Sequence, residues 1–249
     1  ALCKLENYKE TAKKAYSSFP KNRKAVIKKR SPRPRLSNSD TRKIVDAAAK
    51  EFFSVRMRIT DGMKLIEEGN EYNESHGVLY DEKSYESILS YLSKLYPGAI
   101  PRQKEINLNN SNLLKIIKNE FGGYSNVTAL CNISARDCIA AILLLTFTFA
   151  LNPETVLKLD FSKINEMEIL GKKIVVINAE KNRSRKEQVF SINKEFEVCS
   201  GITLGDILDF FKMANERLIN EVSSSHKTRV FLFCNKTKIL EPRGFGKME

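Results

Sequence analysis

The sequence has few of the residues from which metal and redox sites are built. It contains two histidines, His76 and His226, and five scattered cysteines without a C-x-x-C pair. This pattern argues against a disulfide framework or a zinc site, and we expect buried or unreactive thiols instead. A Walker-type glycine-lysine loop, a G-x-G-x-x-G motif and a His-Glu pair are also missing. We therefore expect no bound metal and no cofactor.

Long apolar runs are missing as well. The longest one, Cys138–Leu151, is interrupted by two threonines. It is shorter than the roughly 20 residues that a bilayer-spanning helix needs. No basic and apolar signal segment opens the chain. We therefore expect no membrane association and a cytoplasmic, nucleoid-associated protein, or a nuclear one in a eukaryote.

The net charge of +12 is distributed very unevenly. Residues 1–35 hold 12 Lys and Arg against 2 Asp and Glu, a net charge of +10, whereas the rest of the chain holds 30 against 28. Because such a segment repels itself in water, it favours a polyanionic partner, and we expect double-stranded DNA. A solvated tail or localisation signal and an anionic membrane surface are the alternatives. The arm residues predicted to contact DNA are Lys21, Arg23, Lys24, Lys28, Lys29, Arg30, Arg33 and Arg35.

The sequence predicts three parts and a fold that is mainly α with a small antiparallel β-sheet. A basic arm and linker covers residues 1–36, where Ser31-Pro-Arg-Pro-Arg35 favours extended backbone. A helical domain is expected over 37–125. A mixed domain is expected over 126–249, because strand patterns appear there for the first time.

Three helices are predicted in the second part. Apolar residues at a spacing of three to four predict the first over about 40–68, with Gly69 as its stop. The second covers about 81–96, and the third runs from the asparagine-rich segment 107–112 to Gly122. The residues of the second helix expected to face inward are Ile88, Leu89, Leu92 and Leu95.

Two capping-box patterns mark helix starts in the third part, each with a hydroxyl followed three residues later by a carboxylate. Ser134-Ala-Arg-Asp137 precedes residues 138–149, which are apolar on all sides and so typical of a central core helix. Thr203-Leu-Gly-Asp206 opens an amphipathic helix that we expect to end near Val222.

Between these helices the sequence predicts a helix restart and a small sheet. Asn152 is the expected cap of the restarted helix and Pro153 its first-turn proline. A polar tip over 180–187 joins the last two predicted strands. Val230–Cys234 is expected as a buried strand or a core extension, and Pro242–Gly246 as a turn that is not a natural domain end. The predicted strands cover 167–170, 173–177 and 188–192.

The order of these elements from Asp137 to about Ile192 resembles the first half of the catalytic domain of tyrosine recombinases, the phage integrase family. An apolar helix is followed by Thr148-Phe-Ala-Leu-Asn-Pro-Glu-Thr-Val-Leu-Lys-Leu159, which is similar to the family's T-G-L-R-x-S-E-x-x-x-L turn and helix. A small sheet with Lys181 at a hairpin comes next. The match covers less than a quarter of the chain, and the helical part before it is similar in kind to the family's core-binding domain.

The resemblance implies a DNA-binding protein of site-specific recombination or integration, as found in mobile elements, with self-association on DNA. Lys181 matches the family's hairpin lysine, which protonates the leaving 5′ oxygen, so it is the one candidate catalytic residue. Its alternative is a solvated hairpin lysine. Together with Arg183 and Arg185, Lys181 is also expected to contact the DNA backbone.

The departures from the family concern the groups that cut DNA. The family's first arginine falls on Asn152, which is neutral and cannot clamp a phosphate, and a helix N-cap explains it. The acidic partner position falls on Thr155, with Glu154 one residue early. We interpret His226-Lys-Thr-Arg229 as a chance H-x-x-R match in a loop. The last tyrosine, Tyr124, precedes the whole region, so we expect this chain alone to be inactive.

Three interpretations remain open at this point. The first is a recombinase whose C-terminal catalytic segment is missing or lies beyond residue 249. The second is a recombinase-derived DNA-binding protein that never cuts. The third is a non-catalytic helical adaptor whose basic arm binds RNA or an acidic protein partner.

Overall fold

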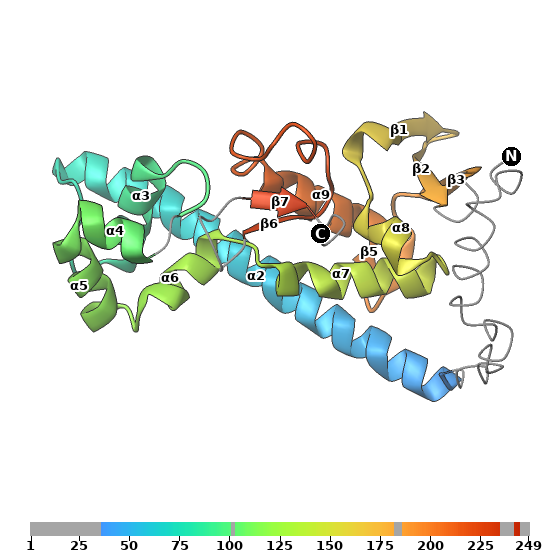
Figure 1. Cartoon of the computed structure of the whole chain (residues 1–249), viewed down its shortest axis with the longest axis horizontal. Helices are drawn as coiled ribbons and strands as arrows, with labels where there is room; N and C mark the ends of the chain where they lie inside the picture. Colours follow the sequence, from blue (N-terminus) through green and yellow to red (C-terminus); the bar gives the residue numbers. More distant parts are fainter. Residues whose placement is uncertain (1–35, 101–102, 182–185, 235–241, 245–249) are drawn as a thin grey trace, which may run out of the picture. The chain divides into compact units, whose positions relative to one another are not determined.

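The structure is a computed structural model that describes residues 36–100, 103–181, 186–234 and 242–244 (Figure 1). The chain divides into two units, Ala1–Asn38 and Ser39–Glu249. Apart from the first residue of one helix, every element described below belongs to the second unit. The arm residues that we expect on DNA lie outside the described ranges.

The first half of the described chain is helical, as predicted. Its helices are α2 (Asn38–His76), α3 (Tyr85–Leu95), α4 (Gln103–Asn109), α5 (Ser111–Glu120) and α6 (Tyr124–Cys131). The short helices α4 and α6 were not predicted, and the boundary predicted between residues 125 and 126 falls inside α6.

The second half adds the strands to a few further helices. The elements are α7 (Ala135–Thr148), α8 (Pro153–Leu157), the 3-10 helix η2 (Phe161–Lys163), β1 (Ile164–Ile169), β2 (Lys172–Lys181), β3 (Lys186–Asn193), β4 (Glu197–Cys199), β5 (Ile202–Thr203), α9 (Leu204–Asn215), β6 (Leu232–Cys234) and β7 (Pro242–Gly244). The predicted class, mainly α with a small antiparallel sheet, is therefore confirmed. None of the described helices is long and apolar enough to cross a membrane.

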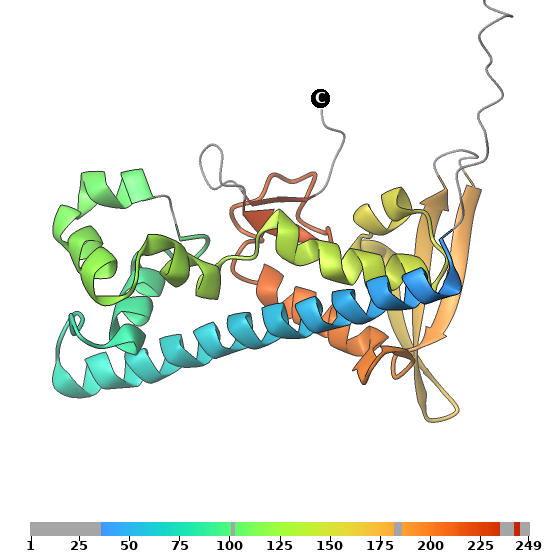
Figure 2. The same ribbon diagram turned by 90° about the horizontal axis from the view of Figure 1, so that it is seen from below.

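Helix α2 corrects the prediction that Gly69 ends the first helix. The helix continues to His76, and Gly69 is buried inside it. A Cβ atom at Gly69 would overlap the backbone carbonyl of Glu86, and one at Gly62 would overlap that of Leu130. The two glycines therefore allow close helix–helix contact. Figure 2 shows α2 running alongside both the bundle α3–α6 and α7.

Two hydrophobic cores flank α2. Its N-terminal part, with Phe52 and Val55, packs into a core with α7, α9 and the three-stranded sheet. A separate core joins α3, α4, α5 and α6. Leu95, predicted to face this second core, is instead 46% exposed at the end of α3, while Ile88, Leu89 and Leu92 are buried as predicted.

Both capping boxes are confirmed. Ser134 and Asp137 form one at the start of α7, and Thr203 and Asp206 form the other at the start of α9. Helix α9, however, ends at Asn215 and does not reach Val222. The Asn215 amide group donates hydrogen bonds to the carbonyl oxygens of residues 229 and 230, at 3.1 and 2.9 Å, and so draws the returning chain against the end of the helix.

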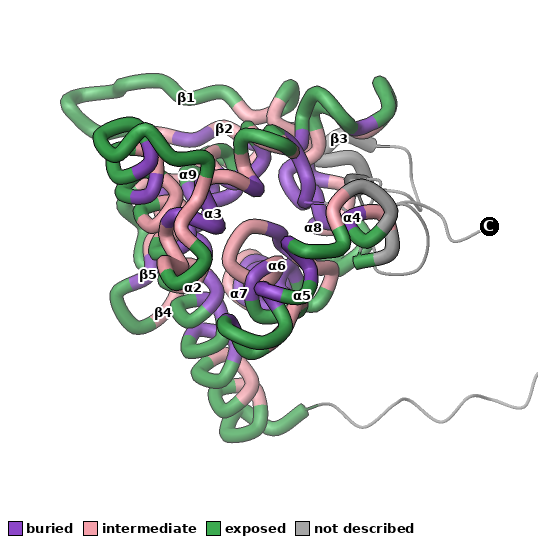
Figure 3. Tube along the Cα trace, turned by 90° about the vertical axis from the view of Figure 1, so that its left-hand side faces the viewer, coloured by how far each residue is buried: buried purple, intermediate pink, exposed green. Residues whose placement is uncertain are grey.

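The main sheet is antiparallel in the order β1-β2-β3. Val175 and Ile177 of β2 are buried against the larger core, whereas β1 is exposed over most of its length and is drawn almost entirely green in Figure 3. Val230–Cys234, predicted as a buried strand or a core extension, is buried and contains β6. Pro242–Gly244, predicted as a turn, pairs with it as antiparallel β7.

Candidate nucleic-acid interface

Of the hairpin residues predicted to contact DNA, Lys181 lies in the described part. It is the last residue of β2, and its Cα atom is the register partner of that of Lys186 in β3. The preceding register pair is Glu180 and Glu187. The hairpin therefore carries a pair of lysines beyond a pair of glutamates. Arg183 and Arg185 fall between the strands and outside the described residues, as do the arm residues Lys21–Arg35.

The position that the resemblance assigns to the first catalytic arginine acts as a helix cap. The Asn152 side chain accepts a hydrogen bond of 3.0 Å from the backbone N–H of Glu154, and Pro153 occupies the first turn of α8. The Glu154 carboxylate in turn forms an ion pair of 2.9 Å with Lys158, one turn further along. The local sequence thus builds a short capped helix here, as predicted, and leaves no cation at Asn152.

The H-x-x-R stretch lies in turns after α9 and not in a helix. The Arg229 Nη1 atom donates a hydrogen bond of 2.6 Å to the carbonyl oxygen of Lys158, which is the C-cap of α8. Burial opposes the charge of Asp160 nearby, but hydrogen bonds from Ser162 and Thr228 and the charge of Arg229 outweigh it and hold the pKa of this carboxyl below its usual value. Arg229 is therefore engaged with the end of a helix and a carboxylate.

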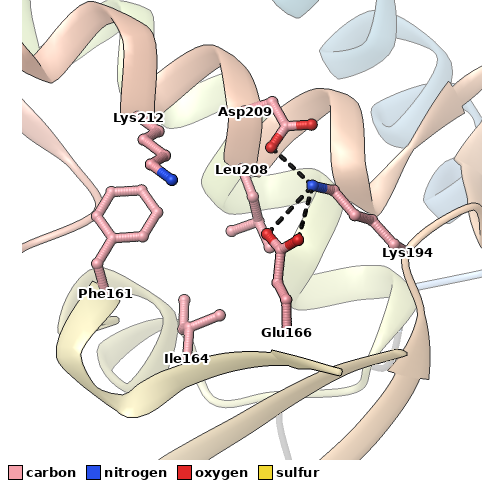
Figure 4. Close-up of a pocket in the computed structure, with 7 residues that line it drawn as sticks. All are labelled: Phe161, Ile164, Glu166, Lys194, Leu208, Asp209 and Lys212. Atoms are coloured by element: carbon pink, nitrogen blue, oxygen red, sulfur yellow. Dashed lines mark hydrogen bonds and ion pairs between the residues drawn. The ribbon is translucent and has the colours of Figure 1, made fainter. Parts of the chain in front are cut away.

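Lys194, beside the sheet, is also paired with carboxylates of the chain. The Lys194 Nζ atom contacts the two carboxylate oxygens of Glu166 at 3.1 and 3.0 Å and Asp209 at 2.9 Å (Figure 4). Burial alone would lower the pKa of Lys194, but its hydrogen bonds to the two carboxylates raise it. These groups border a hollow of about 420 Å³. Because Lys194 joins the end of β3 to β1 and α9, its role is structural.

Two arginines of α2, which the sequence analysis did not single out, bind the two capping boxes. Arg56 forms an ion pair of 2.8 Å with Asp206 at the start of α9, and Arg58 forms one of 2.9 Å with Asp137 at the start of α7. Each carboxylate also accepts bonds from the cap residue of its own helix. The capping boxes were visible in the sequence, but no sequence pattern connects them to α2. In the described ranges, no group of three or more His, Cys, Asp or Glu could hold a metal ion.

No protein family matches the sequence, and neither a curated protein nor a solved structure gives a significant match.

Proposed function

We propose that this chain is a DNA-binding protein of site-specific recombination or integration, similar in plan to tyrosine recombinases, that holds DNA without cutting it. The observation that carries the proposal is the net charge of +10 on residues 1–35. Basic side chains at this density repel one another. Binding to a polyphosphate neutralises this charge and releases the counterions of the polyphosphate, which favours association.

The order of elements after α6 supports the recombinase part of the proposal. An apolar helix, the capped restart at Asn152, a short helix and a three-stranded sheet with Lys181 at its hairpin follow one another as the resemblance implies. Lys181 and Lys186 are register partners at the end of the hairpin. Lysine is one of the side chains through which proteins contact phosphate backbones.

The proposal excludes strand cleavage by this chain because three required groups are missing or engaged. Asn152 caps α8, Arg229 binds the carbonyl of Lys158, and no tyrosine follows Tyr124 in the sequence. Incubation with a nicked suicide substrate should therefore trap no covalent protein–DNA adduct. An adduct mapped to one of the eight tyrosines would overturn this part of the proposal.

The main test is the salt dependence of duplex DNA binding by the full chain and by a variant lacking residues 1–35. Each lost phosphate contact should reduce the slope of log affinity against log salt by about 0.9. We expect weaker binding and a clearly flatter plot for the variant. A full-length variant with the eight predicted contact residues of the arm changed to Gln is the matched control, and it should behave like the deletion. An unchanged slope would remove the arm from the interface.

The hairpin is tested with two double variants of the β2–β3 pair. Lys181→Ala with Lys186→Ala removes the register pair, and Lys172→Ala with Lys173→Ala removes two exposed charges at the other end of β2. Only the first should weaken DNA binding, by roughly tenfold. Thermal stability should stay nearly the same in both, within about 0.5 kcal/mol. Equal affinity of both variants, or tighter binding of RNA or an acidic protein than of DNA, would favour the adaptor interpretation.

A further inference from the structure

A cleft of about 770 Å³ opens between α2, α6 and α7. These helices precede the hairpin in the sequence. The walls of the cleft carry many polar groups, including the hydroxyls of Ser54 and Thr128 and two guanidinium groups, Arg58 and Arg136. The lining also includes the apolar residues Val55, Ala129 and Ile133. The hydroxyl and guanidinium groups are of the kind that contact the phosphate oxygens of nucleic-acid backbones. The neighbouring arginine of α2, Arg56, does not line the cleft and so provides an internal control.

Arg58 is positioned by one ion pair and keeps further N–H donors. Its Nη2 atom lies 2.9 Å from the carboxylate of Asp137, and its side chain keeps 30% exposure. Asp137 is itself fixed by bonds of 2.8 Å from the backbone N–H and hydroxyl of Ser134. A guanidinium group carries five N–H donors in a rigid plane, so donors of Arg58 remain for a ligand in the cleft.

Arg136 occupies a position that helix stability does not favour. It lies in the first turn of α7, where the partial positive charge of the helix dipole repels a cation. Its side chain is exposed and forms no hydrogen bond or ion pair to another described residue. A bound anion would turn this unfavourable placement into a favourable one.

We propose that the cleft binds a phosphate of the nucleic-acid backbone through Arg58 and Arg136. This inference rests on the proposed DNA-binding function and adds to it a second contact region, separate from the arm and the hairpin. Bidentate arginine–phosphate pairs are shorter and stronger than neutral hydrogen bonds, and two of them fix the position of a strand.

Two carboxylates of the cleft limit what it binds. The charge of Asp137 is offset by Arg58 and by the donors of its own capping box. Glu51 is exposed on the cleft wall and pairs with no other described residue. It therefore opposes an anion, and its removal should tighten binding. This sign is specific to an anionic ligand, because a cationic or neutral one would bind less tightly or equally.

The experiment measures duplex DNA affinity against salt for the full chain and four variants. Arg136→Ala tests the cleft without breaking a contact, and Lys118→Ala, an exposed lysine of α5, matches its charge change. Arg58→Lys keeps the charge beside Asp137 but loses bidentate geometry, and Arg56→Lys repeats this at the other capping box. We expect roughly tenfold weaker binding for the two cleft variants. The salt slope should fall by about 1 for Arg136→Ala, and both controls should stay within twofold of the parent.

A fifth variant, Glu51→Gln, should bind DNA several-fold more tightly. Wild-type affinity and slope for Arg136→Ala and Arg58→Lys, while deletion of the arm still flattens the slope, would overturn the cleft and leave the proposed function standing. A parent chain that binds no duplex DNA would overturn both. The last measurement is the Tm in the presence of inorganic phosphate. If phosphate raises the Tm of the parent but not of Arg136→Ala, while both bind DNA equally, the cleft binds a free phosphate. The inference is then wrong.

Discussion

The two ends of α2 are held by different chemistry. The N-terminal part inserts apolar side chains into the larger core, where Phe52 meets Phe210 edge to face with ring centroids 5.6 Å apart. The C-terminal part approaches its neighbours through Gly69 and through a buried polar group, the amide of Asn73, which bonds to Ser87. The N-terminal end is therefore fixed mainly by filled volume, whereas the C-terminal end combines the partly buried Leu65 and Ile66 with backbone proximity and hydrogen bonds.

The charges of α2 follow the same division. Its first two thirds carry six cations and four carboxylates, whereas the stretch from residue 65 to 76 carries four glutamates and neither lysine nor arginine. A phosphate backbone is repelled by the acidic end and attracted by the other. Under the proposed DNA-binding function, this difference favours a duplex along the part of α2 that contains Arg58 and away from the bundle end. The glutamates are Glu67, Glu68, Glu71 and Glu74.

The largest effect is expected where volume holds the helix. Phe52 is fully buried, so Phe52→Ala should leave a cavity and lower the free energy of unfolding by about 3–5 kcal/mol. The adjacent Phe53 is 58% exposed, and Phe53→Ala should change it by no more than about 0.5 kcal/mol. Urea unfolding followed by circular dichroism measures both. Equal losses would mean that α2 does not pack in this register.

At the other end, Gly69→Ala should destabilise although alanine is the better helix former. The intrinsic gain is about 1 kcal/mol, but the new methyl group would overlap the carbonyl of Glu86. Overpacking of this kind costs about 1–3 kcal/mol beyond that gain. Glu68→Ala, an exposed neighbour on α2, is the control and should be close to neutral. A stabilised Gly69→Ala variant would show that α2 and α3 are further apart.

The sequence predicted what local patterns determine. Both capping boxes and the Asn152 cap depend on residues three or fewer apart, and all three occur as predicted. Gly69 was misinterpreted as a helix stop because the contact that requires it, with Glu86, lies far away in the sequence. The end of α9 at Asn215 was missed for the same reason, since its side chain bonds to residues 229 and 230.

The candidate site follows the same rule. Lys181 could be placed at a hairpin because the two strands and their polar tip are adjacent in sequence. The cleft could not be predicted, because it joins residues of α2, α6 and α7 that only tertiary packing brings together. Arg136 lies within a predicted capping box, but nothing in the sequence connects it to Arg58 of α2.

The buried polar group at the end of α2 gives an intermediate effect. The Ser87 hydroxyl donates to the Asn73 amide oxygen and accepts from the backbone N–H of Asp81 at 2.7 Å. Ser87→Ala would leave both partners without this hydroxyl and should cost about 1–3 kcal/mol. Ser93→Ala, on the same helix, alters no hydrogen bond between described residues and is the control. A near-neutral Ser87→Ala would mean that water replaces the hydroxyl and that this end of α2 is less tightly packed.

The smallest expected effect distinguishes the charge of Asp206 from its hydrogen bonds in the capping box at the start of α9. Burial opposes the charge of Asp206, but bonds from Thr203 and Arg56 outweigh it and lower the pKa of Asp206 below its ordinary value of 3.8. A carboxyl with a lowered folded-state pKa stabilises the fold above its unfolded pKa, and this stability is lost as the pH falls through the folded value. Asp206→Asn should therefore cost about 1 kcal/mol at pH 7, the usual worth of a cap, and progressively less below about pH 4.

Arg56→Ala should cost less than Asp206→Asn, about 0.5 kcal/mol, because its side chain is 41% exposed and water screens the pair. Urea unfolding of the parent and both variants at pH 7 and pH 3 gives the comparison. If Asp206→Asn costs as much at pH 3 as at pH 7, the lost stability comes from a missing hydrogen-bond acceptor and not from the missing charge. Arg56 would then contribute packing alone, and the two arginines of α2 would differ only in that Arg58 faces a cleft.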